Sequence, residues 1–155
     1  MKDGFQIWKN LNLPLLQFNR SCQRVDDKDK IIDFSICLES TLLYGVNKEL
    51  GYRLALRAAM LCKNTRTTTN TFEFIKSLYD IRSKVVHENQ PLSHKKISNQ
   101  LRKINAGMNI HDYLNEADLL MRDILIQVVE RISTGKSLKQ LCTDLDTEIL
   151  SAIAA

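Results

Sequence analysis

The sequence predicts an all-α fold, an up-and-down helical bundle of five to seven helices, and three observations support this prediction. Apolar residues recur at intervals of three and four along most of the chain, as in helices with one buried face. The chain has only five Gly and two Pro, so turns are few. Its 155 residues suffice for one hydrophobic core, and we expect a single domain over residues 1–155.

Composition indicates a globular protein without membrane segments. Hydrophobic residues make up 44% of the chain and charged residues 26%, and the net charge is a modest +4. No apolar run reaches the ~18 residues that cross a bilayer, and the N-terminus lacks the apolar core of a secretion signal. We therefore expect a cytoplasmic protein with no membrane partner.

Four cysteines are scattered along the chain, and the three histidines do not cluster with them. A zinc site needs clustered ligands, so the sequence predicts no metal site and no other cofactor. The expected state of the thiols is free and mostly buried, as is usual for cysteines in a reducing compartment. These cysteines are Cys22, Cys37, Cys62 and Cys142.

The first three expected helices cover about 13–24, 27–44 and 48–62. Pro14 suits the first turn of the first helix, because proline has no N–H to contribute there. Asp26 is a favourable N-cap for the second helix. Apolar residues occur around most of that helix, which predicts a central position in the bundle.

The fourth expected helix covers about 71–87. Asn70 followed by Glu73 has the spacing of a capping box, although Asn replaces the usual Ser or Thr. Pro91 prevents the helix from extending further.

Three more helices are expected after that proline. A short one covers 93–104 and ends before Gly107. A long, strongly apolar one covers 112–132 and is broken at Gly135, and the last covers 137–153.

Two charged residues interrupt the apolar stripes of the central helices. Glu39 lies on an inward stripe of the second helix, and Arg57 borders that of the third, one turn after Arg53. Burying such groups is costly unless they are partnered. The structural interpretation is an ion pair of Glu39 with Arg53 or Arg57 that fixes the register of two helices. In the functional alternative, Glu39 reaches the fourth helix and orients a catalytic cation.

Arg82 and His87 are the candidate functional pair of the fourth helix. Arg82 lies on a mostly apolar stripe, so its guanidinium needs an acidic partner or a crevice that opens onto an anion. His87 follows five residues later, about 140° around an ideal helix, in the last turn. An Arg and a His at this spacing are a weak signal by themselves.

Three blocks in order give this pair a context: DKIIDFSICLE at 29–39, ELGYRLALR at 49–57 and LYDIRSKVVH at 78–87. Together they resemble the Apea-like branch of the HEPN domains. The resemblance covers about 26–89 and the later long helix at 112–132. It implies a HEPN-type bundle, often dimeric, that acts in antiviral defence or toxin–antitoxin systems.

The resemblance implies that active members cleave RNA without metal, at a cleft where the motifs of two subunits meet. Here Arg82 would stabilise the phosphorane and His87 would donate a proton, with His87 of a second subunit as the possible base. We expect RNA and a second copy of the chain as partners. Supporting roles at the site are expected for Ser83, Tyr79, Asp80 and Glu39.

A basic stretch could hold the RNA backbone, because residues 89–111 contain no acid. The alternative is an ordinary solvated surface. The expected RNA-binding residues are Lys84, Lys95, Lys96, Arg102 and Lys103.

Some residues depart from the family pattern. Ser83 stands where active members often have Asn, Glu88 stands where Gly is expected, and Asn89 replaces a Tyr that antitoxins modify in one subgroup. These differences leave two alternatives open: an inactive HEPN module that binds RNA or nucleotides, and a protein-interaction subunit such as a partner in an antitoxin complex.

Overall fold

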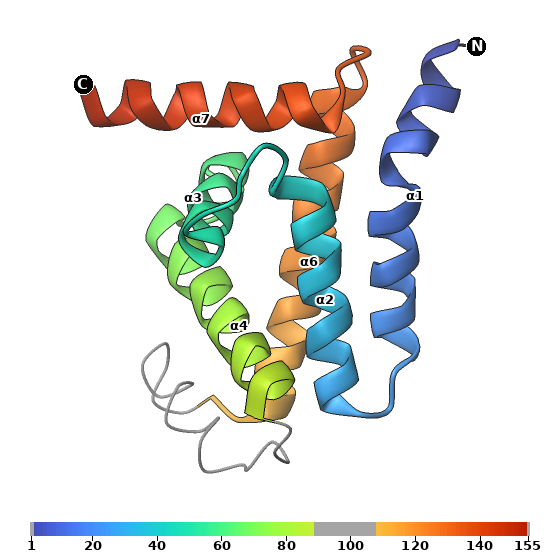
Figure 1. Cartoon of the computed structure of the whole chain (residues 1–155), viewed down its shortest axis with the longest axis vertical. Coiled ribbons are helices and arrows are strands. Elements are labelled where there is room, and N and C mark those ends of the chain that lie inside the picture. Colours follow the sequence, from blue (N-terminus) through green and yellow to red (C-terminus); the bar gives the residue numbers. More distant parts are fainter. Residues whose placement is uncertain (1, 89–107, 155) are drawn as a thin grey trace.

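The computed structural model of the chain describes residues 2–88 and 108–154, and the side chains of 7–86 and 108–154. Within these residues it contains six helices and no strand, which confirms the all-α prediction (Figure 1). None of the described helices is long and apolar enough to cross a membrane. The helices are α1 (Lys2–Gln23), α2 (Asp27–Leu42), α3 (Leu50–Leu61), α4 (Thr68–Glu88), α6 (Ile110–Ile132) and α7 (Leu138–Ala154).

The helices form a bundle in which α2 is central. Helix α1 packs along α2, and α2 also contacts α3, α4 and α6. Helices α3 and α4 pack closely on each other, and α7 lies across the end of the bundle at which α2 and α6 finish (Figure 1). The expected short helix at 93–104 lies outside the described residues.

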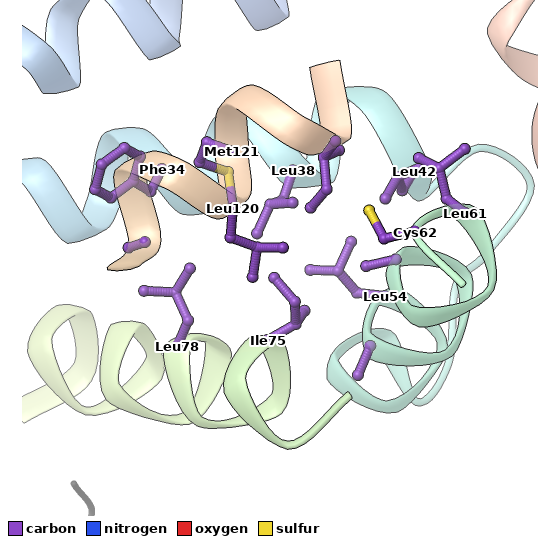
Figure 2. Close-up of a cluster of buried hydrophobic side chains, with 14 of the residues drawn as sticks. Phe34, Leu38, Leu42, Leu54, Leu61, Cys62, Ile75, Leu78, Leu120 and Met121 are labelled. Atoms are coloured by element: carbon purple, nitrogen blue, oxygen red, sulfur yellow. The ribbon is translucent and has the colours of Figure 1, made fainter. Parts of the chain in front are cut away.

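The hydrophobic core lies where α2, α3, α4 and α6 meet (Figure 2). Each helix contributes side chains at intervals of three or four, as the sequence pattern predicts. Phe74 stacks on the buried ring of Tyr113, with 4.6 Å between the ring centroids. The labelled members of the core are Phe34, Leu38, Leu42, Leu54, Leu61, Cys62, Ile75, Leu78, Leu120 and Met121.

Two helix boundaries confirm the sequence analysis. The Asp26 side chain accepts hydrogen bonds from the backbone N–H groups of Lys28 and Asp29, at 2.8 and 3.3 Å, and so caps α2. Gly135 separates α6 from α7 with a φ of +90°, a conformation that glycine adopts without steric cost. Asn109, which the sequence analysis did not single out, caps α6 by accepting from the N–H of Asp112, so α6 begins at Ile110 and not at about 112.

Two other boundaries were predicted wrongly. Helix α1 begins at Lys2, so Pro14 lies in its interior instead of its first turn. Helix α4 begins at Thr68, and Asn70 is therefore a helical residue instead of a cap. At that end Thr71 donates from both its N–H and its hydroxyl to the carbonyl of Thr67, which extends the helix by almost a turn.

Arg57 is buried, but its acidic partner is not the predicted Glu39. Its guanidinium is 3% exposed and donates through Nε and Nη2 to Asp146 of α7, at 2.8 and 2.7 Å. Nη1 donates to the carbonyls of Leu42 and Tyr44, at 2.6 and 3.0 Å. The predicted pairing was wrong because Asp146 lies 89 residues away in the sequence, on α7. The spacing of residues within one helix does not show that α7 crosses the end of α2.

Glu148 provides a second attachment of α7. Its carboxylate accepts from Arg131 of α6 and from Lys63, which follows α3. These cations lower the pKa of Glu148 from 4.5 to about 2, with the Arg131 hydrogen bond as the largest cause. Glu148 therefore attaches α7 by ion pairs to α6 and to the segment that follows α3.

The cysteines are free, as expected. Cys37, Cys62 and Cys142 are buried, and burial raises the pKa of the Cys37 thiol to about 12 and that of Cys62 to about 11. Cys22 is exposed and lies 3.5 Å from a carboxylate oxygen of Asp118.

We predict that Arg57→Ala lowers the free energy of unfolding by about 3–5 kcal/mol, the range for breaking a buried ion pair. The substitution also leaves the carbonyls of Leu42 and Tyr44 without a donor. Urea unfolding followed by circular dichroism measures the change. The control is Arg53→Ala, one turn earlier and exposed, for which we expect a change within about 0.5 kcal/mol. Equal losses in the two variants would contradict the assigned role of Arg57.

A second prediction concerns pH. Because the pKa of Glu148 in the folded state lies below 4.5, its ion pairs stabilise the protein above that pH and cease to do so as the pH falls toward about 2. Glu148→Gln should therefore be less stable than the wild type by about 1 kcal/mol at pH 7. The difference should disappear in acid, as measured by urea unfolding at each pH. Glu73→Gln, at an exposed position of α4, is the control, and a difference independent of pH would refute the prediction.

Candidate functional site

Arg82 and Glu39 approach each other between α4 and α2. Arg82 Nη2 lies 3.7 Å from Glu39 Oε1, close enough for an ion pair but too far for a hydrogen bond. The two side chains are 24% and 27% exposed. Among the described residues, neither Arg82 Nε nor Glu39 Oε1 has a hydrogen-bond partner, although both atoms are buried. The guanidinium is thus held near a carboxylate and retains unused donors.

The aromatic ring of Tyr79 packs beneath the guanidinium of Arg82. The guanidinium carbon of Arg82 lies 6.0 Å from the centroid of the Tyr79 ring, one turn earlier on α4. The ring in turn packs on Gly51 of α3, where an added Cβ would lie 2.6 Å from Tyr79 Cδ1. Burial raises the pKa of the Tyr79 hydroxyl, and the nearby Glu39 carboxylate raises it further.

The direction of the Arg82 side chain separates it from His87 within one chain. Its guanidinium lies over Tyr79 and so extends toward the start of α4, as long side chains do in helices. His87 lies in the opposite direction, about 7.5 Å further along the helix axis and about 140° around it. The backbone of His87 is in the last turn of α4, and its side chain is outside the described set.

The other expected site residues on α4 differ in exposure. Asp80 and Lys84 are exposed and Ser83 is half-buried. Asp80 and Ser83 precede His87 at helical intervals of seven and four residues, so these three positions lie along one side of α4. The expected RNA-binding residues Lys95, Lys96, Arg102 and Lys103 lie outside the described residues.

A hollow next to Glu39 was missed by the sequence analysis. It lies between α1 and α2, has a volume of about 310 Å³ and is open to solvent. Glu39 lines it together with Lys9, Asn10 and Pro14. No sequence signal indicates it, because the hollow forms only where residues of α1 pack beside α2 and the segment that follows it.

This arrangement would allow Arg82 to bind a phosphate while Glu39 stays beside it. A guanidinium presents several donors in a plane and binds phosphate through two of them at once. Arg82 makes no hydrogen bond to Glu39 that an incoming phosphate would have to break. The carboxylate can hold Arg82 in place electrostatically while the free donors bind the anion.

Comparisons with known proteins provide no relative for this chain. No family model matches it, and no curated protein and no solved structure is significantly similar to it.

We predict that Gly51→Ala destabilises the protein by about 1–3 kcal/mol, because the new methyl group displaces the Tyr79 ring. The sign is opposite to helix propensity, which favours Ala over Gly by up to about 1 kcal/mol. Urea unfolding of Gly51→Ala, Tyr79→Ala and the double variant tests this. If the ring is the obstacle, the added methyl costs much less in the Tyr79→Ala background. An equal cost in both backgrounds would place the strain elsewhere.

Proposed function

We propose that this protein is a metal-independent endoribonuclease of the HEPN type, of the Apea-like branch. In this proposal it acts as a cytoplasmic homodimer in a defence or toxin–antitoxin system. The observation that carries the proposal is the state of Arg82: its side chain is 24% exposed, its guanidinium lies 3.7 Å from a carboxylate, and its buried Nε has no hydrogen-bond partner among the described residues. A structural arginine would have its donors satisfied, as those of Arg57 are.

The reaction uses the nucleophile that RNA carries. The 2′-hydroxyl attacks the adjacent phosphorus, the bond from phosphorus to the 5′-oxygen breaks, and a 2′,3′-cyclic phosphate and a 5′-hydroxyl form. His87 gives a proton to the leaving 5′-oxygen, and His87 of a second copy takes the proton of the 2′-hydroxyl. Arg82 holds the additional negative charge of the phosphorane.

The remaining residues position this chemistry. Glu39 orients Arg82, and Tyr79 supports its guanidinium. Ser83 and Asp80 contact the phosphate and sugar from the same side of α4 as His87. The RNA backbone is bound by Lys84 together with Lys95, Lys96, Arg102 and Lys103.

The second copy has a definite part in this proposal. Within one chain the Arg82 guanidinium extends away from the position of His87, so a second subunit is the source of the complementary group. Helix α6 carries an exposed apolar stripe that could be covered by another chain, with Leu119, Ile126 and Val129 exposed by 53%, 54% and 40%.

An inactive HEPN module that binds RNA or nucleotides is the second candidate. Ser83 and Glu88 favour it, because Ser83 stands where active members often have Asn and Glu88 follows His87 where Gly is expected. The same apolar stripe of α6 favours a third candidate, a protein-interaction subunit.

The test is RNA cleavage by the purified chain in excess chelator. We expect products with 2′,3′-cyclic phosphate ends, and a rate that falls by about 10²–10⁴-fold in His87→Ala, the usual contribution of an acid–base group. Arg82→Ala should also lose activity. The matched control is His111→Ala, at an exposed position of α6, which should cleave at the wild-type rate.

No cleavage by the wild type, or equal cleavage by His87→Ala, would reject the nuclease. Affinity for RNA that falls with salt and depends on Arg82, without turnover, would select the binding module. No RNA binding at low salt, with tight binding to a protein, would select the interaction subunit.

A further inference from the structure

We propose that two copies of this chain pair through α1 and α6, with α1 of each copy packed against α6 of the other. In a two-fold dimer of this kind the same contact forms twice. The need for a second copy rests on the function proposed above. The surface itself is inferred from the side chains of α1 and α6 and does not depend on any cleavage chemistry.

The outer side of α6 carries an apolar stripe. Leu119, Arg122, Ile126 and Val129 recur at intervals of three and four residues, so they lie along one side of the helix. The three apolar members are exposed by 53%, 54% and 40%, whereas the buried apolar residues of the same helix are at most 6% exposed. A narrow stripe with this spacing is typical of the seam along which two helices pack on each other.

The outer side of α1 carries a second apolar group. Trp8 and Leu16 are exposed by 59% and 44%. They are about 80° apart around the helix, and both lie on the side away from Leu11, Gln17 and Ser21, which are buried. Tryptophan is among the residues that contribute most to binding at protein interfaces. Helix α1 therefore also offers a surface on which another helix can pack.

These two apolar groups border each other on one face of the molecule. Helices α1 and α6 run antiparallel (Figure 1), and Cys22 Sγ lies 3.5 Å from Asp118 Oδ1. The guanidinium carbon of Arg122 lies 5.2 Å from the centroid of the Phe18 ring. Trp8 is fourteen residues before Cys22 and so lies on the same side of α1, four turns away. The indole is therefore beside the last turns of α6.

The two helices carry opposite charge, which decides how the copies pair. Between residues 7 and 23, α1 has Lys9 and Arg20, both exposed, and no acid. Helix α6 has five carboxylates against two arginines, and Asp112 and Glu130 are exposed beside its stripe. Pairing α6 with α6, or α1 with α1, would bring like charges together. Pairing α1 with α6 of the other copy brings opposite charges together, so this arrangement is favoured.

The exposed apolar area is sufficient for a specific dimer. The five apolar residues of the two groups expose on the order of 500 Å² in one copy, at the upper end of the largest patch on a typical monomer. Two copies would bury about 1,000 Å² from these residues alone, which is near the lower limit for a specific interface. The polar residues around them add to this area. We therefore expect a dimer with a dissociation constant in the micromolar range.

The test is the dissociation constant of the full chain, measured by sedimentation equilibrium. Trp8→Glu places an acid against the acidic α6 of the other copy, and Ile126→Lys places a cation against the basic α1. Each should weaken the dimer at least tenfold. The matched control is Ile153→Lys, at a position of α7 that is 76% exposed, which should dimerise like the wild type. Circular dichroism checks folding, and Trp8→Ala or Ile126→Ala replaces a variant that does not fold.

An equimolar mixture of Trp8→Glu and Ile126→Lys tests the cross-pairing itself. In the heterodimer, one of the two contacts joins an unchanged α1 to an unchanged α6, and the other joins the new acid to the new cation. The mixture should therefore dimerise at least tenfold more tightly than either variant alone. Pairing of α6 with α6 would instead leave Trp8→Glu as dimeric as the wild type.

A wild type that stays monomeric at millimolar concentration, a folded Trp8→Glu that dimerises like the wild type, or a mixture no tighter than its components would overturn the proposal. RNA cleavage separates these outcomes from the proposed function. A dimer that depends on Trp8 and Ile126, without any cleavage, leaves the interface in place and removes the nuclease. Cleavage by a monomeric wild type, or by a Trp8→Glu variant that remains dimeric, removes the interface and leaves the nuclease.

Discussion

The guanidinium of Arg57 is 3% exposed, and a charge withdrawn from water to this degree must be surrounded by fixed acceptors. Two of these are the carbonyls of Leu42 and Tyr44, where α2 ends and helical carbonyls lack intrahelical donors. The third is the carboxylate of Asp146, which brings α7 across this end. Arg57 thus donates to the free carbonyl groups at the end of α2 and joins α2, α3 and α7. Its positive charge also interacts favourably with the partial negative charge at the C-terminus of α2.

This constraint extends to the candidate site. Glu39 lies one turn before the end of α2 that Arg57 holds, so the position of its carboxylate follows from that attachment. Helix α3 carries Gly51 as well as Arg57. The Tyr79 ring packs closely on Gly51, and this contact positions the ring next to the Arg82 guanidinium. The separation of Arg82 from Glu39 is therefore a property of three packed helices.

Periodicity predicted the helices of the bundle, because burial of one face is a local requirement. It also placed Glu39 and Arg82 correctly as charges that need partners. It paired the cations wrongly because the partner of Arg57 lies on α7, and local spacing carries no information about which helices cross. The hollow was missed for a related reason: it forms where α1 packs beside the end of α2, and the spacing within each helix does not show which residues of the two come together.

The distribution of the cysteines has a consequence for following the motions of this protein. Cys22 is exposed, whereas Cys37, Cys62 and Cys142 are enclosed by packed helices, and desolvation raises the pKa of all four thiols. Because the pKa is raised for all four thiols, access decides which of them a thiol reagent modifies first, and in the native state that is Cys22. The slower modification of the other three then measures how often the bundle opens, and mass spectrometry can follow it without an added probe.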